Sequence, residues 1–191
     1  MPRRFDELLT PRLRLRRWRP ADREPFAAMN ADPDVMRYFV SPLDPAASDA
    51  LVDRIETRFD EQGYGLWALE RLSDGRFLGF TGLNPMPPGT PGAGEMEVGW
   101  RLARPAWGHG YATEAAIAAL QVWFETLGED RVWSITTVTN TPSQAVMRRL
   151  GLVEQTRYRA PSLPHEHELS PCVAYGGSAS TWAGRTGSMA P

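Results

Sequence analysis

The sequence is poor in cysteine, in net charge and in long apolar runs, and each shortage narrows what the protein can do. Cys172 is the single cysteine, so no internal disulfide can form, which fits a reducing cytoplasm. The formal net charge of -2 gives no electrostatic basis for binding nucleic acid or an anionic membrane. No apolar run approaches the roughly 20 residues of a membrane span, and no apolar segment follows the basic N-terminus as in a signal peptide. We therefore expect a cytoplasmic protein that acts on neither nucleic acid nor membranes.

The length of 191 residues suits one domain with a sizeable core. Residues 1–9 are expected to be a loose leader. Residues 176–191 are small, polar and glycine-rich, which is typical of a flexible tail. The folded domain is therefore expected at 10–175.

Hydrophobic periodicity predicts a mixed α/β chain. Strands are expected at 10–18, 65–71, 76–82, 95–103, 131–139, 152–159 and 172–175. Helices are expected at 21–30, 45–62 and 111–127, in a brief turn from Pro33, and from Pro142 up to Gly151, with Thr141 as the N-cap. In the first strand leucines alternate with Arg12, Arg14 and Arg16, which indicates an outer strand whose arginines face solvent.

The glycine turn WGHGYA carries the clearest chemical signal. Gly108 and Gly110 leave the backbone bare, so a bulky anion can approach it closely. The helix at 111–127 starts immediately afterwards, and its first N–H groups have no partners within the helix. These donors and the positive end of the helix dipole predict a phosphate or pyrophosphate site. The alternative is an ordinary strand–helix connection without a ligand.

Two other motifs carry weaker signals. His165 and His167, with His109 and Cys172, offer metal-ligating side chains, but their spacing matches no closed zinc pattern, so we expect a solvated loop and no metal. A dinucleotide-binding oxidoreductase is also a poor fit, because WGHG is not GxGxxG and the chain lacks repeated βαβ units.

Three segments in this order and spacing resemble the GCN5-related N-acetyltransferase (GNAT) superfamily: EVGWRL (97–102), PAWGHGYATEA (105–115) and NTPSQAVMRRLGL (140–152). The opening TPRLRLRRWRPAD, followed by DPDVMRYF, looks like the branch that contains ribosomal-protein alanine N-acetyltransferases. The resemblance covers roughly residues 10–160. It implies a mixed, mostly antiparallel sheet of about six to seven strands flanked by helices, splayed between the strands at 95–103 and 131–139.

The resemblance also implies the binding site of acetyl-CoA, the acetyl donor. The pyrophosphate would be bound by backbone N–H groups of Trp107, Gly108, His109, Gly110, Tyr111 and Ala112. The acetyl group and pantetheine would be aligned by strand-like hydrogen bonds to Arg101, Leu102 and Ala103. Asn140 and Ser143 match the family's NxxS positions beside the cofactor. Pro105 stands where the family usually has Gln or Arg, and Arg104 is a candidate for the missing charge.

The acceptor amine must lose a proton before it attacks a thioester, and a carboxylate acting through water can take it. Glu97 matches the family's strand carboxylate and is the candidate base, with Glu95 in reserve. Met147 stands where many members have the tyrosine that protonates the CoA thiolate, so Ser143, water or Tyr158 are the remaining candidates.

The resulting hypothesis is an N-acetyltransferase that moves an acetyl group from acetyl-CoA to a primary amine, on a protein N-terminus or a small molecule. The alternative is a non-catalytic acyl-CoA-binding or sensing module on the same fold, which would keep the turn but not depend on Glu97. A homodimer is compatible with either reading.

Overall fold

The computed structural model describes residues 3–186; residues 1–2 and 187–191 lie outside the described part. The chain forms two compact units. The first comprises the residues up to Leu83 together with Gly99–Ala118, and the second comprises Asn84–Val98 together with the residues from Ala119 on. Strands β4 (Phe77–Pro85) and β5 (Met96–Leu102) and helix α4 (Tyr111–Gln121) each contribute residues to both units.

The strands follow the order β1-β2-β3-β4-β5-β6-β8-β7 in an eight-stranded sheet. The remaining strands are β1 (Glu7–Leu9), β2 (Leu13–Arg16), β3 (Leu66–Arg71), β6 (Arg131–Thr137), β7 (Val153–Arg159) and β8 (Pro171–Ser178). Most pairs are antiparallel, whereas β5 and β6 are parallel with Glu97 opposite Trp133. The expected mixed α/β class with a mostly antiparallel sheet is confirmed, and the strand count exceeds the expected six to seven.

The N-terminal segment of the first unit corrects two expectations. Residues 7–9 are not a loose leader, because β1 pairs with β2 along the register Glu7 to Arg16, and the Phe5 carbonyl accepts the indole N–H of Trp67 at 2.7 Å. With β1 on one side and β3 on the other, β2 is not an outer strand. Arg16 does not face solvent either: it is 5% exposed and ion-paired to Asp22 and Glu70.

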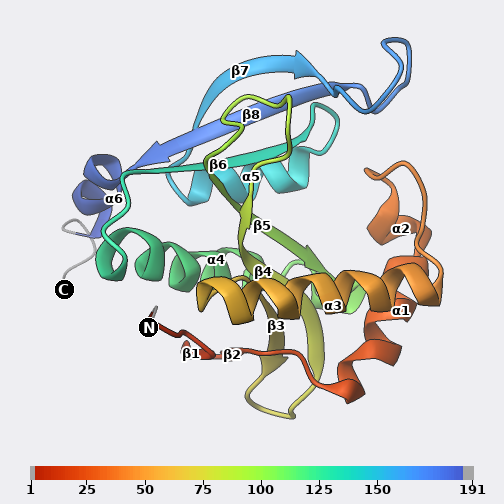
Figure 1. Cartoon of the computed structure of the whole chain (residues 1–191), viewed down its shortest axis with the longest axis vertical. Helices are drawn as coiled ribbons and strands as arrows, with labels where there is room; N and C mark the ends of the chain where they lie inside the picture. The colour runs from red at the N-terminus through yellow and green to blue at the C-terminus, as the bar shows by residue number, and fades with distance from the viewer. Residues whose placement is uncertain (1–2, 187–191) are drawn as a thin grey trace. The chain divides into compact units, whose positions relative to one another are not determined.

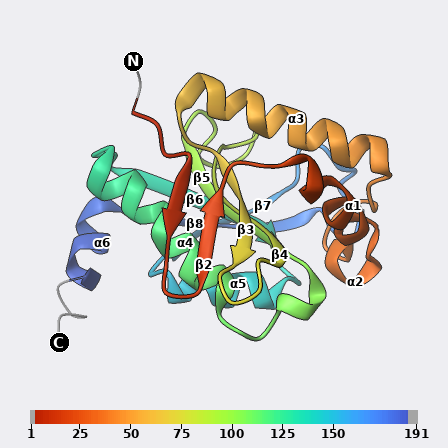
Figure 2. The same cartoon turned by 90° about the horizontal axis from the view of Figure 1, so that it is seen from below.

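The helices of the first unit that precede β3 begin and end at local signals. They are η1 (Pro20–Asp22), α1 (Arg23–Ala31), α2 (Pro33–Met36) and α3 (Pro45–Gln62), and Figure 2 shows α1 and α2 gathered near one end of α3. The Asp32 carboxylate accepts the N–H groups of Asp34 and Val35, and Asp44 accepts that of Ala47, so both predicted aspartate–proline starts are confirmed. Gly63 ends α3 with a φ of 81°.

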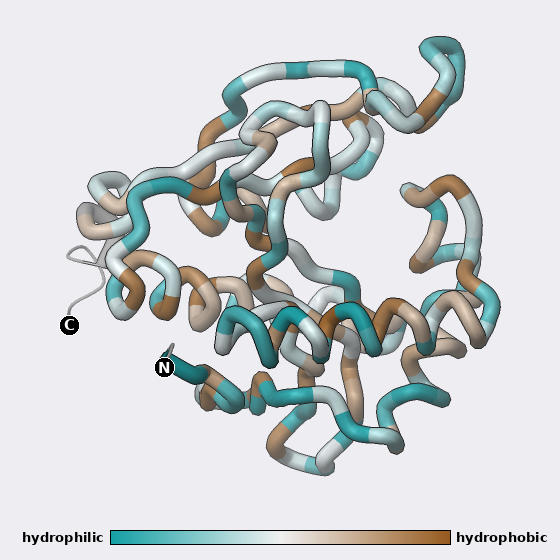
Figure 3. The backbone as a smooth tube through the Cα atoms, in the orientation of Figure 1, coloured by the Kyte–Doolittle hydropathy of each residue, from teal (hydrophilic) through white to brown (hydrophobic). Residues whose placement is uncertain are grey.

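The core of the first unit is aromatic and aliphatic. The colours along α3 alternate between hydrophilic and hydrophobic (Figure 3), and Val52, Ile55 and Phe59 form its buried face. The Phe59 ring packs edge-on against Trp67 on β3, with 5.5 Å between the ring centroids. This packing holds α3 against the sheet.

The second unit contains the strand group β6-β8-β7, with η3 (Val122–Thr126), a π-helical continuation of α4, and helices α5 (Thr141–Arg149) and α6 (Ala179–Thr186) (Figure 1). The expected flexible tail is wrong for residues 176–186, because β8 runs to Ser178 and α6 follows it. Trp182 of α6 is buried and donates its indole N–H to Glu125 at 2.8 Å. The rest of the predicted tail, 187–191, lies outside the described residues. Within 3–186, no helix combines the length and apolar character needed to cross a membrane.

Candidate functional site

The glycine turn lies between β5 and α4 in the first unit. After β5 ends at Leu102, a 3-10 turn (η2, Arg104–Ala106) leads into the turn itself. Gly108 and Gly110 both have a φ of 78°, a conformation that favours glycine. A Cβ at Gly108 would meet no atom within 4 Å, and one at Gly110 would meet only an Arg12 nitrogen at 3.6 Å. The turn therefore leaves its backbone uncovered.

The first N–H groups of α4 are available for an anion. The Glu114 N–H donates to the Gly110 carbonyl at 3.1 Å, so the N–H groups of residues 111–113 precede the helical hydrogen-bond ladder. Gly110 has no side chain with which to cap them. Bare backbone donors at the positive end of a helix dipole favour a phosphate-like group.

Arg12, from the segment before β2, bonds both the turn and the first turn of α4. Its guanidinium donates to the His109 carbonyl at 3.0 Å and to the Glu114 carboxylate at 2.6 Å, and lies 4.8 Å from the centroid of the Tyr111 ring. The Thr10 hydroxyl donates to the same carboxylate at 2.6 Å. Burial raises the pKa of Glu114, but the hydrogen bonds from Thr10 and Arg12 outweigh it and lower that pKa below its usual value. The Glu114 charge is thus neutralised by a fixed partner.

Sequence reasoning missed this network, because Arg12 and Glu114 are 102 residues apart and each has an ordinary reading alone. The only usable signal was a carboxylate in the first turn of a helix expected to bind an anion, which needs a compensating cation nearby.

Two side chains beside the turn have defined partners. The indole N–H of Trp107 donates to the Leu102 carbonyl at 2.8 Å, although the residue remains 44% exposed. Arg104, the proposed replacement charge, forms an ion pair of 2.8 Å with Asp34 of α2. Its charge is therefore shared with a carboxylate of the same unit.

The register of β5 shows which edge of the strand the peptide groups of residues 101–103 face, the three positions predicted to align the pantetheine. The Ala103 N–H donates to the Leu78 carbonyl, and the Gly99 carbonyl accepts the hydroxyl of Thr81, so odd-numbered residues bond toward β4. By strand alternation, the peptide groups of Arg101 also face β4, and those of Leu102 face the other edge. Leu102 is thus the member of this set whose N–H is oriented away from β4.

The two candidate bases of the second unit differ in their contacts. Glu95 accepts the indole N–H of Trp133 at 2.9 Å and lies 3.6 Å from the Arg131 guanidinium. Glu97 accepts the side-chain amide of Asn84 at 3.3 Å. A carboxylate that already bonds an indole and an arginine is a poor base, which weighs against Glu95.

Tyr158 of β7 is partly buried, and its pKa is raised. Its ring packs on a buried cluster that includes Trp133 and Ala174. Burial is the main cause that raises the pKa of Tyr158, with Cys172 and the Glu97 charge adding to it, so the hydroxyl keeps its proton. Burial also raises the pKa of the Cys172 thiol.

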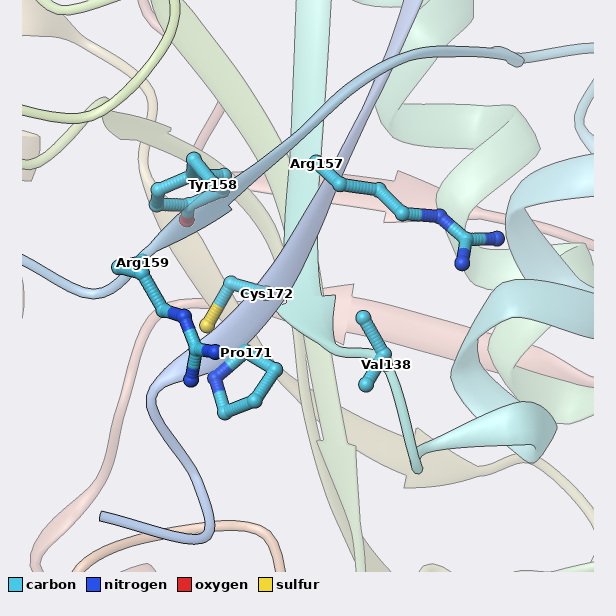
Figure 4. Close-up of a pocket in the computed structure, with 6 residues that line it drawn as sticks. All are labelled: Val138, Arg157, Tyr158, Arg159, Pro171 and Cys172. Atoms are coloured by element: carbon cyan, nitrogen blue, oxygen red, sulfur yellow. The ribbon is translucent and has the colours of Figure 1, made fainter. Parts of the chain in front are cut away.

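Tyr158 also lines an open pocket of about 360 Å³. The other lining residues are Val138, Arg157, Arg159, Pro171 and Cys172. In Figure 4, Arg159 turns toward Cys172, whereas Arg157 points away from both. The pocket lining thus includes a phenol that keeps its proton, a thiol and two arginine side chains.

The start of α5 corrects the predicted cap. Asn140, rather than Thr141, is the N-cap: its side-chain oxygen accepts the Ser143 N–H at 3.2 Å, and its amide donates to the Thr136 hydroxyl at 2.9 Å. Asn140 is the cap because its side-chain carbonyl reaches the N–H of the third helical residue. Met147 is completely buried, and its thioether has no proton to donate, so position 147 supplies no acid to the site.

The structure brings residues 101–103 and 107–112 together in the first unit, whereas Glu97, Asn140 and Ser143 belong to the second. Among residues 3–186, no three His, Cys, Asp or Glu side chains are grouped so that they could hold a metal ion. His167 instead accepts the Leu169 N–H through Nδ1 at 3.1 Å.

Among the comparisons with known proteins, a family model identifies the family. A family model described as an acetyltransferase (GNAT) domain matches residues 12–153. The chain is 33% identical over 149 residues to the protein YkkB of Bacillus subtilis (strain 168), covering 76% of this chain and 84% of that protein. It is 35% identical over 94 residues to the FsC-acetyl coenzyme A-N(2)-transacetylase of Aspergillus fumigatus, covering 47% of this chain and 39% of that protein.

Solved structures show the same fold. An acetyltransferase from Agrobacterium tumefaciens superimposes with a TM-score of 0.73 at 27% identity, covering 90% of this chain and 93% of the other. A GNAT-family acetyltransferase from Bacillus anthracis gives a TM-score of 0.75 at 21% identity, covering 91% and 99%.

Proposed function

The chain belongs to the GNAT acetyltransferase family, and on that premise we propose that it transfers an acetyl group from acetyl-CoA to a primary amine. The observation that carries the proposal is the start of α4, directly after Gly108 and Gly110, where no side chain caps the first backbone N–H groups. The name of the Aspergillus relative, FsC-acetyl coenzyme A-N(2)-transacetylase, supports the same donor and the same kind of acceptor atom. The family match spans residues of both units, which supports residues 10–175 acting as one catalytic domain.

In this proposal the pyrophosphate of acetyl-CoA is bound by the backbone N–H groups of 107–112. These groups are fixed before binding, because Arg12 anchors the His109 carbonyl and the first turn of α4. Preorganised donors lose little conformational freedom on binding, which favours affinity. The Leu102 N–H, on the edge of β5 away from β4, would bond the pantetheine or acetyl carbonyl.

The proposed reaction forms an N–C bond and breaks a C–S bond, so one proton must leave the amine and one must reach the thiolate. Holding a lysine-like amine of pKa ~10 neutral at pH ~7 costs about 4 kcal/mol, but an α-amino group near ~8 costs only about 1.4 kcal/mol. Glu97, acting through water, takes this proton. An α-amino acceptor, such as a protein N-terminus, is the easier substrate for a carboxylate base.

The second proton requires a donor other than residue 147. Ser143, half-buried in the first turn of α5, and water are the candidates from this region. Tyr158 is the weakest of the candidates, because burial and the Glu97 charge raise its pKa and so make its hydroxyl a poorer acid.

Glu97→Gln tests the proposal against the non-catalytic alternative. Removing the base should lower kcat for a panel of primary amines by about 10²–10⁴-fold, measured as thioester consumption, and leave acetyl-CoA affinity unchanged. Glu95→Gln is the matched control on the same strand and should change kcat far less, since Glu95 bonds Trp133. Acetyl-CoA binding without turnover of any amine would instead support an acyl-CoA-binding module.

A further inference from the structure

Arg101 on β5 is a largely buried cation without a carboxylate partner. One terminal nitrogen donates to the Asn30 side-chain oxygen at 2.7 Å, whereas Nε is buried and has no hydrogen-bond partner. Among the described residues no carboxylate lies within ion-pair distance of the guanidinium, and burial lowers the pKa of Arg101 to about 10 with no acidic neighbour to offset it. The side chain therefore stays charged at neutral pH in a poorly solvated place, which is energetically costly.

The groups that surround the Arg101 guanidinium are uncharged, and the amide among them is held in place by its own hydrogen bond. Asn30 is completely buried and donates its amide to the Ser48 hydroxyl at 2.9 Å, which turns its carbonyl oxygen toward Arg101. The guanidinium lies 4.1 Å from the ring centroid of Phe39 and 5.5 Å from that of Phe80. These aromatic rings stabilise a cation in part but leave its hydrogen-bonding capacity unused.

The other buried arginine of this unit shows what full compensation requires. Arg16 is paired to Asp22 at 2.7 Å and to Glu70 at 2.8 Å. The same fold thus supplies two carboxylates to one buried arginine and none to the other. Arg101 differs because no residue of the described chain provides its anion.

Nε of Arg101 has no hydrogen-bond partner, and a guanidinium can bind a carboxylate in the bidentate manner through Nε and a terminal nitrogen. Phe39 and Val40, in the segment that follows α2, are 42% and 65% exposed, so the ring that packs on the Arg101 guanidinium belongs to a surface segment. Gly99 alternates onto the same side of β5 as Arg101, and a Cβ there would meet no atom within 4 Å. A small anionic group has room on this side of the strand.

We propose that the Arg101 side chain binds a carboxylate of the acceptor, so that the preferred substrates are amines that carry a carboxylate. This proposal rests on the proposed acetyl transfer. It assigns to the side chain a role separate from that of the β5 backbone. Carboxylate binding would complete the pairing that the chain leaves open and would set the acceptor's position along β5.

The test compares amino acids and dipeptides with their neutral amides as acceptors. With the wild type, each acid should have a lower KM than its amide. Arg101→Gln should reduce this acid-to-amide preference in kcat/KM at least about tenfold, mainly through KM, without changing acetyl-CoA affinity by calorimetry. Arg101→Lys, which keeps the charge but not the fork, should fall between the two. Arg76→Gln, an exposed arginine of the first unit, is the charge-matched control and should keep the preference.

Thermal unfolding separates this role from a structural one and from failure of the acetyl transfer. Arg101→Gln should unfold at or above the wild-type temperature, because it removes an unpaired buried charge. The acids should raise the unfolding temperature of the wild type more than the amides do, and this difference should vanish in Arg101→Gln, whether or not any amine is acetylated. An unchanged preference for acids in Arg101→Gln, or equal stabilisation of the wild type by acids and amides, would overturn the assignment.

Discussion

Helices α4 and α5 both begin directly after a loop, yet they treat their first N–H groups in opposite ways. The residue before α4 is Gly110, which has no side chain to serve as a cap. The nearby charges, on Arg12 and Glu114, pair with each other. The residue before α5 is Asn140, whose own side chain accepts the Ser143 N–H. The start of α4 is therefore open to an external anion, whereas the start of α5 is satisfied from within the chain.

The difference shows how one backbone feature serves two purposes. A helix start bonded by its own cap gains stability but offers fewer donors to a ligand. A start left uncapped loses that stability and needs support from elsewhere, which α4 receives from the Arg12 network. The resemblance to the family placed the cofactor beside the starts of both α4 and α5, and the geometry favours the start of α4.

The larger expected effect on stability is at the start of α4, which the Arg12 network supports. Glu114→Gln removes the carboxylate that accepts bonds from Thr10 and Arg12 and should lower the free energy of unfolding by about 1–3 kcal/mol at neutral pH. Because the pKa of Glu114 is lowered in the fold, its contribution is present above the ordinary carboxyl value of 4.5 and is lost as the pH falls through the lower folded pKa. Denaturant titrations of both proteins should therefore differ at neutral pH and converge in acid.

Glu24, an exposed carboxylate in the first turn of α1, gives the matched control. Glu24→Gln should cost less than about 1 kcal/mol. Equal losses in the two variants, or a Glu114→Gln loss that persists unchanged in acid, would show that Glu114 does not support the turn electrostatically.

The smaller expected effect on stability is at the start of α5, which Asn140 caps. Asn140→Ala should lower the free energy of unfolding by about 1 kcal/mol and change acetyl-CoA affinity by less than about tenfold. Asn140→Asp keeps a capping oxygen and should stay near wild-type stability. If the aspartate variant remains stable but loses acetyl-CoA affinity more than tenfold, Asn140 lies beside the cofactor phosphates and the comparison of the two starts fails.

The sequence predicted those features that depend on near neighbours. The starts of α2 and α3 followed from Asp32-Pro33 and Asp44-Pro45, because a cap and a proline act within one helical turn. The glycine turn and α4 followed in the same way. The exchange of Thr141 for Asn140 as the cap is an error of one residue, within the usual uncertainty of helix ends.

Features that depend on distant partners were missed. Residues 7–9 form a strand only because β2 offers an edge, and α6 is held by the Trp182–Glu125 bond, 57 residues apart in sequence. Arg16 and Arg101 look alike in a leucine- or tryptophan-flanked strand, and only the fold shows that one has two carboxylates and the other has none. Tertiary pairing of this kind leaves no periodic signal in the sequence.

The most direct test of the account is a calorimetric titration of acetyl-CoA into the wild type and Gly110→Asp. Gly110→Asn separates the added charge from the backbone change, and Gly75→Asp, at another glycine of positive φ with open space around it, controls for strain. The account predicts micromolar-range binding to the wild type and to Gly75→Asp, weaker binding to Gly110→Asn, and none to a folded Gly110→Asp, since a carboxylate there repels the pyrophosphate. Failure of the wild type to bind, or undiminished binding by Gly110→Asp, would contradict the assignment of the glycine turn as the phosphate site.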